Sequence, residues 1–350
     1  MKTIVLLFIY ATFSTCVWSQ NFKLKLTEHA FNVESVSYSP DGKYLASGST
    51  DGTINLYNID SSGNPIYTRS LLGHLGSVTQ LIFTKNSKYL VSSSKDYSSR
   101  IWNLDTPSLD KVYNIHFEPV TTSFLDASYK YLISASLDGT IKLTHLYDSK
   151  KSRTVKIGTP INDLKVSSDN KFYYVALKGG LIKKLETVGK NNEIMTFTGH
   201  GDEINAIELS PVGGFMASAS HDKSIIIWDI NTGKIVKKFQ GYEWKVTSIQ
   251  YSSDGNYIVG GCNDGCAKLF EVSSGKHIID FKELGKNVRK VSVNKNGKQV
   301  AIATQLEGDK FGAIIYNTGV EVLPPTSNKP SAKSSAKPTA KPTAKPTATK

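Results

Sequence analysis

Short apolar runs alternate with turn signals along most of this chain. Residues 199–239 show one full cycle of the pattern. Four stretches have the composition of strands, and they cover residues 204–209, 215–220, 225–228 and 234–239. β-Branched and aromatic residues are typical of strands, and the Gly, Pro, Asn and Asp clusters between the stretches are typical of tight turns. The cycle therefore predicts four short strands joined by hairpins.

A fixed polar marker accompanies this cycle. A ring-bearing residue is followed 22 positions later by aspartate at five places. The pairs are His29/Asp51, His74/Asp96, His116/Asp138, His200/Asp222 and Tyr242/Asp264. An aromatic residue stands six places after four of these aspartates, at Tyr57, Trp102, Trp228 and Phe270. Successive units lie 41 to 45 residues apart, a period typical of repeat folds whose units cover one another.

Four short strands at this period fit one blade of a β-propeller. Seven such units fill residues 29–318, although the fourth lacks the marker pair and the seventh has a longer loop at 305–311. A short strand at residues 22–26 precedes the first unit, and we expect it to complete the last blade. The predicted fold is all-β: a seven-bladed propeller over residues 20–323, closed by the N-terminal strand.

Two units, residues 73–103 and 199–229, resemble the WD-repeat (tryptophan-aspartate repeat) family in their Gly-His and Trp-Asn or Trp-Asp pairs. The resemblance extends over residues 22 to about 318. It implies a buried hydrogen-bonded tetrad in each complete blade. The matching residues are His74, Ser92 or Ser94, Asp96 and Trp102, then His200, Ser218 or Ser220, Asp222 and Trp228. A buried carboxylate needs donors, so the recurring His–Asp pairs are expected to be structural.

Other units keep only part of this set. In the first and third units the histidine and aspartate remain, but Tyr57 and Thr144 replace the tryptophan. In the sixth unit Asp264 remains, while Tyr242 replaces the histidine and Phe270 replaces the tryptophan. We expect these blades to keep the fold with fewer of the bonds that the resemblance implies.

The N-terminus has the composition of a secretory signal peptide. One basic residue precedes the apolar run at 4–13, and small and polar residues follow up to Ser19. Such a segment is removed on secretion, and the apolar run is short for a bilayer span. We therefore predict a signal peptide at residues 1–19, cleavage before Gln20, no transmembrane segment and an extracellular location.

The C-terminus, residues 324–350, is rich in Lys, Pro, Thr and Ala and contains no large apolar residue beyond its first positions. Such a composition predicts a disordered tail. Its lysines contribute half of the formal net charge of +12, and they include Lys333, Lys337, Lys341 and Lys345. The tail is a candidate for binding an acidic polysaccharide or an acidic matrix protein. The alternative is a passive solubilising extension, with or without O-glycosylation.

Two cysteines remain after the predicted cleavage. Cys262 and Cys266 flank a turn at which other units carry hydroxyl residues. Residues facing each other across a hairpin are close enough for a disulfide. The alternative is a pair of small buried thiols that replace serines. No histidine lies nearby in the sequence, so we predict no metal site.

Catalytic motifs are absent from the sequence. It contains no G-x-S-x-G elbow, no H-E-x-x-H zinc motif and no phosphate-binding loop. The His–Asp pairs recur from unit to unit, whereas an active site needs one copy. We therefore predict that the protein is not an enzyme and has no cofactor. No nucleic-acid-reading motif is present, so we also expect no nucleic-acid partner.

A rigid propeller presents loops on broad faces, and we predict that one face binds a protein partner. Phe31 and Trp244 stand two residues after the histidine position of their units. Together with His221 they are candidates for an aromatic contact patch. The alternative is that these side chains only cover their own loops.

These observations predict a secreted, non-catalytic interaction scaffold, a component of an extracellular matrix, coat or secreted material, whose basic tail binds an acidic component. One alternative is an intracellular WD-repeat adaptor of a multiprotein complex, with an N-terminus that only imitates a signal. The other is a propeller enzyme, which would need a non-repeated polar cluster in the central channel.

Overall fold

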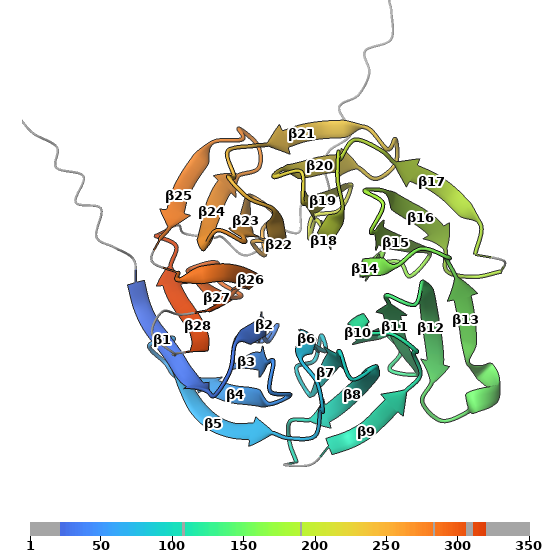
Figure 1. The fold of residues 1–350 in the computed structure, drawn as a ribbon, viewed down its shortest axis with the longest axis horizontal. Helices are drawn as coiled ribbons and strands as arrows, with labels where there is room; N and C mark the ends of the chain where they lie inside the picture. The colour runs from blue at the N-terminus through green and yellow to red at the C-terminus, as the bar shows by residue number, and fades with distance from the viewer. Residues whose placement is uncertain (1–21, 107–108, 190, 283, 306–310, 320–350) are drawn as a thin grey trace, which may run out of the picture.

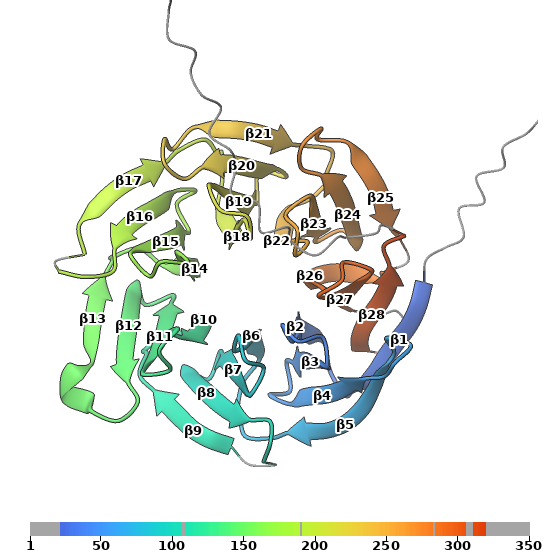
Figure 2. The same ribbon diagram turned by 180° about the vertical axis from the view of Figure 1, so that it is seen from behind.

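The computed structural model describes residues 22–106, 109–189, 191–282, 284–305 and 311–319. These residues form seven four-stranded antiparallel sheets. Figures 1 and 2 show them from both sides as blades around a central axis. The all-β, seven-bladed propeller expected from the repeats is the observed fold. The predicted signal peptide at 1–19 and the tail at 324–350 lie outside the described residues.

The blades are numbered along the chain, and their strands are given from the axis outward. Blades 1 to 4 consist of β2 (Val33–Tyr38), β3 (Tyr44–Ser49), β4 (Ile54–Ile59) and β5 (Pro65–Leu71); β6 (Val78–Phe83), β7 (Tyr89–Ser94), β8 (Ser98–Asn103) and β9 (Leu109–Asn114); β10 (Val120–Leu125), β11 (Tyr131–Ser136), β12 (Thr140–His145) and β13 (Arg153–Lys156); and β14 (Ile161–Val166), β15 (Phe172–Leu177), β16 (Ile182–Glu186) and β17 (Glu193–Phe197).

Blades 5 to 7 follow the same order, except that the last blade takes its outer strand from the N-terminus. They consist of β18 (Ile204–Leu209), β19 (Phe215–Ser220), β20 (Ile225–Asp229) and β21 (Ile235–Phe239); β22 (Val246–Tyr251), β23 (Tyr257–Cys262), β24 (Cys266–Glu271) and β25 (His277–Phe281); and β26 (Lys286–Val293), β27 (Gln299–Gln305), β28 (Phe311–Asn317) and β1 (Phe22–His29). A 3₁₀ turn, η1 (Ser149–Lys151), interrupts blade 3. No helix in the described ranges is long and apolar enough to cross a membrane.

The core lies between the blades. Side chains of a strand alternate between the two faces of its sheet, so both faces of every blade need cover. In β3, β7 and β11 every residue after the first is buried. Each apolar cluster combines neighbouring blades; one joins Ile225 of blade 5 to Val246 and Phe270 of blade 6. The large rings of Trp102 and Trp228 are fully buried in such interfaces.

Blade 7 brings together the two ends of the described chain, seen in Figure 1 as blue β1 beside red β28. β1 pairs antiparallel with β28, and Leu26 lies opposite Ala313. Leu26 is buried and packs in one cluster with Leu45 and Tyr57 of blade 1. The strand is longer than the residues 22–26 expected from the sequence, because it continues to His29.

We expect Leu26→Ala to lower the free energy of unfolding by about 2–4 kcal/mol, since it leaves a cavity between blades 7 and 1. Thr27→Ala is the matched control, because Thr27 is exposed on the same strand; it should change stability by less than about 0.5 kcal/mol. Urea unfolding of the two variants measures the difference. Equal stabilities would show that β1 does not hold these blades together.

Candidate interaction face

The two faces of the propeller carry different turns. Because strands alternate in direction within a blade, the loop entering each first strand lies on the same side as the turn between the second and third strands. We call this side the tetrad face. In blades 1 to 6 it comprises the entrance loops 30–32, 72–77, 115–119, 157–160, 198–203 and 240–245 and the turns 50–53, 95–97, 137–139, 178–181, 221–224 and 263–265. The turns between first and second strands lie on the opposite face.

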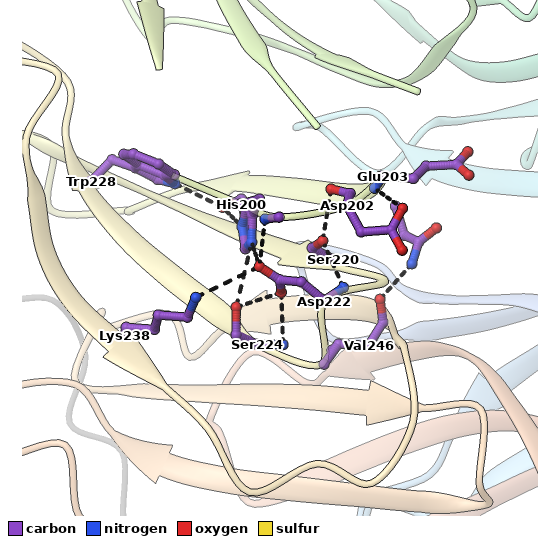
Figure 3. A network of polar contacts seen from close by, with 12 residues as sticks. His200, Asp202, Glu203, Ser220, Asp222, Ser224, Trp228, Lys238 and Val246 are labelled. Carbon is purple, nitrogen blue, oxygen red and sulfur yellow. Dashed lines mark hydrogen bonds and ion pairs between the residues drawn. The ribbon is translucent and has the colours of Figure 1, made fainter. Parts of the chain in front are cut away.

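Blade 5 holds a complete tetrad just below this face, shown in Figure 3. His200 Nδ1 lies 2.8 Å from Asp222 Oδ2, and His200 Nε2 lies 2.7 Å from Ser218 Oγ. Trp228 Nε1 donates to the same hydroxyl oxygen at 2.7 Å. Because an ionised carboxylate only accepts, the imidazole Nδ1–H donates to Asp222 and Nε2 accepts from Ser218. The bonds therefore tie the entrance loop, two strands and the turn of one blade together.

Blade 2 repeats this arrangement. His74 lies 2.8 Å from Asp96 and 2.7 Å from Ser92, and Trp102 Nε1 donates to Ser92 at 2.8 Å. Of the two hydroxyls that the sequence left open in each unit, Ser92 and Ser218 thus complete the tetrads. The other hydroxyl has a different use: Ser94 donates to the carbonyl of Gly76 at 3.0 Å.

Blade 3 keeps the part of the tetrad that does not need tryptophan. His116 Nδ1 lies 2.8 Å from Asp138, and Nε2 lies 2.8 Å from Ser134. The hydroxyl of Thr140 also donates to Asp138 at 2.6 Å. Loss of the indole at Thr144 therefore removes one donor without disturbing the His–Asp bond.

In blade 1 the expected His–Asp bond does not form. His29 Nδ1 lies 2.9 Å from the Thr53 hydroxyl and Nε2 lies 2.8 Å from Ser47, while Asp51 accepts from the Thr53 backbone at 2.7 Å. The reason is local backbone: β1 continues through His29, whereas the histidines of blades 2, 3 and 5 lie in loops. In this blade the prediction of a bonded His29/Asp51 pair is wrong, although both residues still brace the turn.

Blade 6 lacks the imidazole, and its aspartate has a smaller role. Asp264 accepts from the backbone of Cys266 at 2.9 Å and so closes its own turn. The Tyr242 ring is buried at the histidine position, and its hydroxyl donates to the carbonyl of Gly260 at 3.3 Å. Phe270 packs beside Tyr242 with ring centroids 6.1 Å apart. This blade therefore replaces the polar tetrad with ring packing.

The tetrad groups are held in fixed protonation states. Burial lowers the pKa of His200, so the ring is neutral at pH 7. Burial alone would raise the pKa of Asp222, but hydrogen bonds from Ser224 and His200 outweigh it and lower the pKa to about 2. A neutral imidazole that donates to an ionised carboxylate is a stable structural unit, and its recurrence in blades 2 and 3 argues against a catalytic dyad.

Each tetrad aspartate also positions the residue that follows the histidine. The backbone N–H of Leu75 donates to Asp96 at 3.0 Å, and that of Phe117 donates to Asp138 at 3.3 Å. With the backbone held, the side chains of Leu75 and Phe117 point outward and are 92% and 83% exposed. Phe31 of blade 1 is 56% exposed on the same face. We call Phe31, Leu75 and Phe117, on three consecutive blades, the apolar arc.

The predicted aromatic patch is placed differently. Trp244 is 60% exposed on blade 6, and blade 7 lies between it and Phe31. His221 is half-buried, and its imidazole lies 3.7 Å from the Glu203 carboxylate. A joint patch of Phe31, Trp244 and His221 stays a prediction. The sequence analysis missed Leu75 and Phe117, because it considered the second residue after each histidine and not the first.

The two cysteines are free thiols in the structure. They face each other across β23 and β24, as the hairpin pattern predicts. Cys262 Sγ donates to the carbonyl of Trp244 at 3.1 Å, which is the bond that Ser94 and Ser220 make in their own blades. This geometry matches the alternative in which buried thiols replace serines. The disulfide stays a prediction.

The innermost strands carry polar groups that do not repeat. Lys165 Nζ lies 2.7 Å from Glu208 of the next blade, and Lys290 Nζ donates to Gln80 across the axis at 3.0 Å. Asp163 accepts from the backbone of Ile207 at 3.0 Å. These contacts join different blades. Within the described ranges, no three His, Cys, Asp or Glu side chains gather in a way that would hold a metal ion.

Candidate partner-binding residues Lys333, Lys337, Lys341 and Lys345 lie outside the described residues. Their predicted contact with an acidic component therefore rests on composition alone.

Four segments of the chain match the family model of WD40, described as "WD domain, G-beta repeat". They cover residues 20–58, 63–103, 191–229 and 233–271. Together with the seven blades, these matches support a WD-repeat β-propeller. The matched segments leave out blade 3, and of blades 4 and 7 they include only the outer strands, β17 and β1.

Several curated proteins are similar in sequence. Actin-interacting protein 1 of Drosophila melanogaster is 32% identical over 58% of this chain and 34% of its own length. U3 small nucleolar RNA-associated protein 21 of Saccharomyces cerevisiae is 30% identical over 36% of this chain and 13% of its own length. The transcriptional corepressor LEUNIG_HOMOLOG of Arabidopsis thaliana is 27% identical over 57% and 30%, respectively. The chain thus spans about a third or less of these relatives.

We expect the propeller to lose stability as the pH falls below about 6.5. Burial lowers the pKa of the four buried histidines, His29, His74, His116 and His200. Unfolded histidines titrate near 6.5, so below that pH the unfolded chain binds more protons than the folded chain. The stabilisation is complete above about 6.5 and decreases as the pH falls toward the lowered values.

Urea unfolding at pH 7.5, 6.5 and 5.5 tests this. His116→Gln should reduce the slope of stability against pH, because one of the four protonation differences is removed. A free energy of unfolding that is the same at pH 7.5 and 5.5 would contradict neutral, buried imidazoles.

Proposed function

We propose that this WD-repeat β-propeller is a non-catalytic interaction scaffold that binds a protein partner through its tetrad face. The observation that carries the proposal is the apolar arc. Phe31, Leu75 and Phe117 are more than half exposed on consecutive blades, while the backbone beneath Leu75 and Phe117 is fixed by the tetrad aspartates. Large apolar side chains exposed on a fixed backbone are typical of interaction sites, because the loop does not have to be ordered on binding.

The polar groups of the channel support a scaffold over an enzyme. Lys165, Glu208, Lys290 and Gln80 are engaged with one another across blades. A general acid or base must reach a substrate proton, and groups held in inter-blade bonds are poorly placed to do so. The His–Asp pairs each combine a neutral imidazole with an ionised carboxylate and recur from blade to blade, which supports the same conclusion.

The relatives favour an adaptor of a multiprotein complex. Their names refer to interaction with actin, association with a nucleolar RNA and transcriptional corepression. All three are intracellular roles, so they support the intracellular adaptor more than a matrix component. The similarity covers only part of each relative, and the partner of this chain is therefore described by its chemistry: an apolar surface complementary to the arc.

A secreted scaffold is the second candidate, and residues 1–19 favour it. A single basic residue and an apolar run ahead of Ser19 are the composition of a signal peptide. In that case the lysines of the tail would meet an acidic polysaccharide or an acidic matrix protein, while the propeller face would still bind a protein.

We expect the double substitution of Leu75→Ser and Phe117→Ser to reduce partner recovery about tenfold or more. Loss of one central apolar contact costs over about 1 kcal/mol of binding free energy, and a tenfold loss of affinity corresponds to about 1.4 kcal/mol. Val212→Ser is the control, because Val212 is also an exposed apolar residue, at 60% exposure, but lies on the opposite face. Cross-linking of the full chain in cells, followed by mass spectrometry, measures recovery. An unchanged set of partners would remove the apolar arc from consideration.

The intact mass of the native protein, measured in the extracellular fraction and in the cell lysate, tests in which compartment the protein occurs. The adaptor function predicts a chain found inside cells that retains residues 1–19. A species beginning at Gln20 in the medium would instead establish secretion and direct the search to acidic matrix partners. The same mass reports whether Cys262 and Cys266 are joined, because a disulfide removes two hydrogens.

A further inference from the structure

A second surface lies on the face opposite the tetrad face. There, a pocket of about 350 Å³ opens beside the channel between blades 2, 3 and 4. Its walls are mainly apolar and include Ile82, Phe124, Leu125, Leu164 and Val166. The volume falls within the range of sites that accept small ligands or protein side chains.

The apolar walls arise because the innermost strands of two blades differ in sequence from those of the other five. The next-to-last residue of these strands is polar in five blades, namely Ser37, Lys165, Glu208, Gln250 and Ser292. In blades 2 and 3 the same position carries Ile82 and Phe124, which are only half-buried. Water-exposed apolar side chains cost free energy unless something covers them, so this section of the channel wall is suited to an apolar occupant.

The turns around the pocket depart from the repeat in a second way. The fourth residue of the turn between first and second strands is glycine in blades 1, 5, 6 and 7: Gly42, Gly213, Gly255 and Gly297. All four have positive φ, between 67° and 80°. In blades 2, 3 and 4 the residue is Ser87, Tyr129 or Asn170, also with positive φ, at 56°, 54° and 59°.

A bulky side chain in this region of φ is uncommon and strained. Glycine would satisfy the turn better in all three blades, and the other blades use it. Tyr129 and Asn170 instead line the pocket. Ser87 does not line it, and its hydroxyl accepts from the backbone of Asp41 at 3.2 Å. Two of the three turn residues that replace glycine thus contribute to the wall of one cavity.

The rim of the pocket is cationic. The three turns carry Lys85, Lys88, Lys130 and Lys171, all of them exposed. Two acids share these turns: Asp126 accepts from the backbone of Lys130 and Tyr131 at 2.8 and 2.7 Å, and Asp169 forms an ion pair with Lys171 at 3.6 Å. The four lysines outnumber the two carboxylates, so the rim keeps an excess of positive charge. An apolar cavity with a lysine rim is complementary to an apolar group flanked by negative charge.

We propose that this pocket binds an extended segment of a partner protein in which large apolar side chains are flanked by aspartate and glutamate. The apolar side chains enter beside Phe124 and Val166, which are both half-buried in the pocket wall, and the carboxylates lie over the lysines of the three turns. This goes beyond the proposed function, because it adds a second surface on the face opposite the apolar arc. The two surfaces are independent in their residues and can be tested separately.

The test measures binding of a fluorescein-labelled peptide, Gly-Asp-Glu-Phe-Leu-Asp-Glu-Gly, to the full chain by fluorescence polarisation. Two comparison peptides replace Phe-Leu by Ser-Ser or the four acids by lysine. We expect each comparison peptide to bind about tenfold more weakly or worse, since each loses either burial or charge complementarity.

Tyr129→Gly is the decisive variant, because it removes part of the wall while relieving the turn. We expect about a tenfold loss of peptide affinity with an unchanged or higher urea midpoint. Lys130→Glu should weaken binding about threefold or more, whereas Lys43→Glu, at the same turn position of blade 1, should leave it unchanged.

Three results would overturn the proposal: equal binding of the parent and Ser-Ser peptides, unchanged affinity in Tyr129→Gly, or no binding of the parent peptide at millimolar concentration. The double variant Leu75→Ser and Phe117→Ser distinguishes a failure of the pocket proposal from a failure of the proposed function. This double variant should bind the peptide as the parent chain does. If it loses the peptide, the peptide binds the apolar arc; the pocket proposal then fails while the proposed function stands.

Discussion

Mutual cover between blades is the constraint on which this structure depends. A four-stranded sheet has two faces, and no blade can bury both by itself, so each needs a neighbour on either side. The innermost strands add hydrogen bonds across the seams: Thr79 donates to the carbonyl of Val120 and Thr247 to that of Val288, each at 2.7 Å. Blade 7 meets the same requirement with β1 from the other end of the described chain. The ring is therefore one cooperative unit, in which a defect in any blade exposes the next.

The tetrads hold their turns through backbone groups, so the exposed side chains can vary without affecting the fold. Because Asp96 and Asp138 bind the backbone of the residue after the histidine, the identity of that residue's side chain does not affect the turn. Blade 5 makes the same bond to Gly201, at 3.1 Å, with no side chain at all. The exposed position can therefore carry leucine, phenylalanine or glycine at little cost to the stability of the fold. Blades with the same backbone structure can for this reason present different side chains on the surface.

Most of the fold could be predicted from the sequence, because each repeat places the same types of residue at the same spacing. The 22-residue separation of histidine and aspartate reflects one loop, two strands and a turn of constant length, and it located the tetrads of blades 2, 3 and 5. It failed at His29, where the spacing is kept but β1 replaces the loop. Leu75 and Phe117 of the apolar arc were missed for a related reason, although Phe31 was found: which residue of an entrance loop points outward depends on its backbone path, and a shift of one residue reverses the answer.

The departures from the repeat fall on the same part of the ring on both faces. The apolar arc lies on blades 1 to 3, and the pocket lies between blades 2 to 4 on the other side, about 20 Å away along strands of six residues. Two partners bound there would not collide. They would both contact blades 2 and 3, where one cluster contains three fully buried apolar residues, Val91, Ile101 and Leu132, beside hydroxyls such as Ser93 and Ser123. A seam shared by two surfaces is where one partner would most readily affect the binding of the other, since coupling needs contacts that both occupants change.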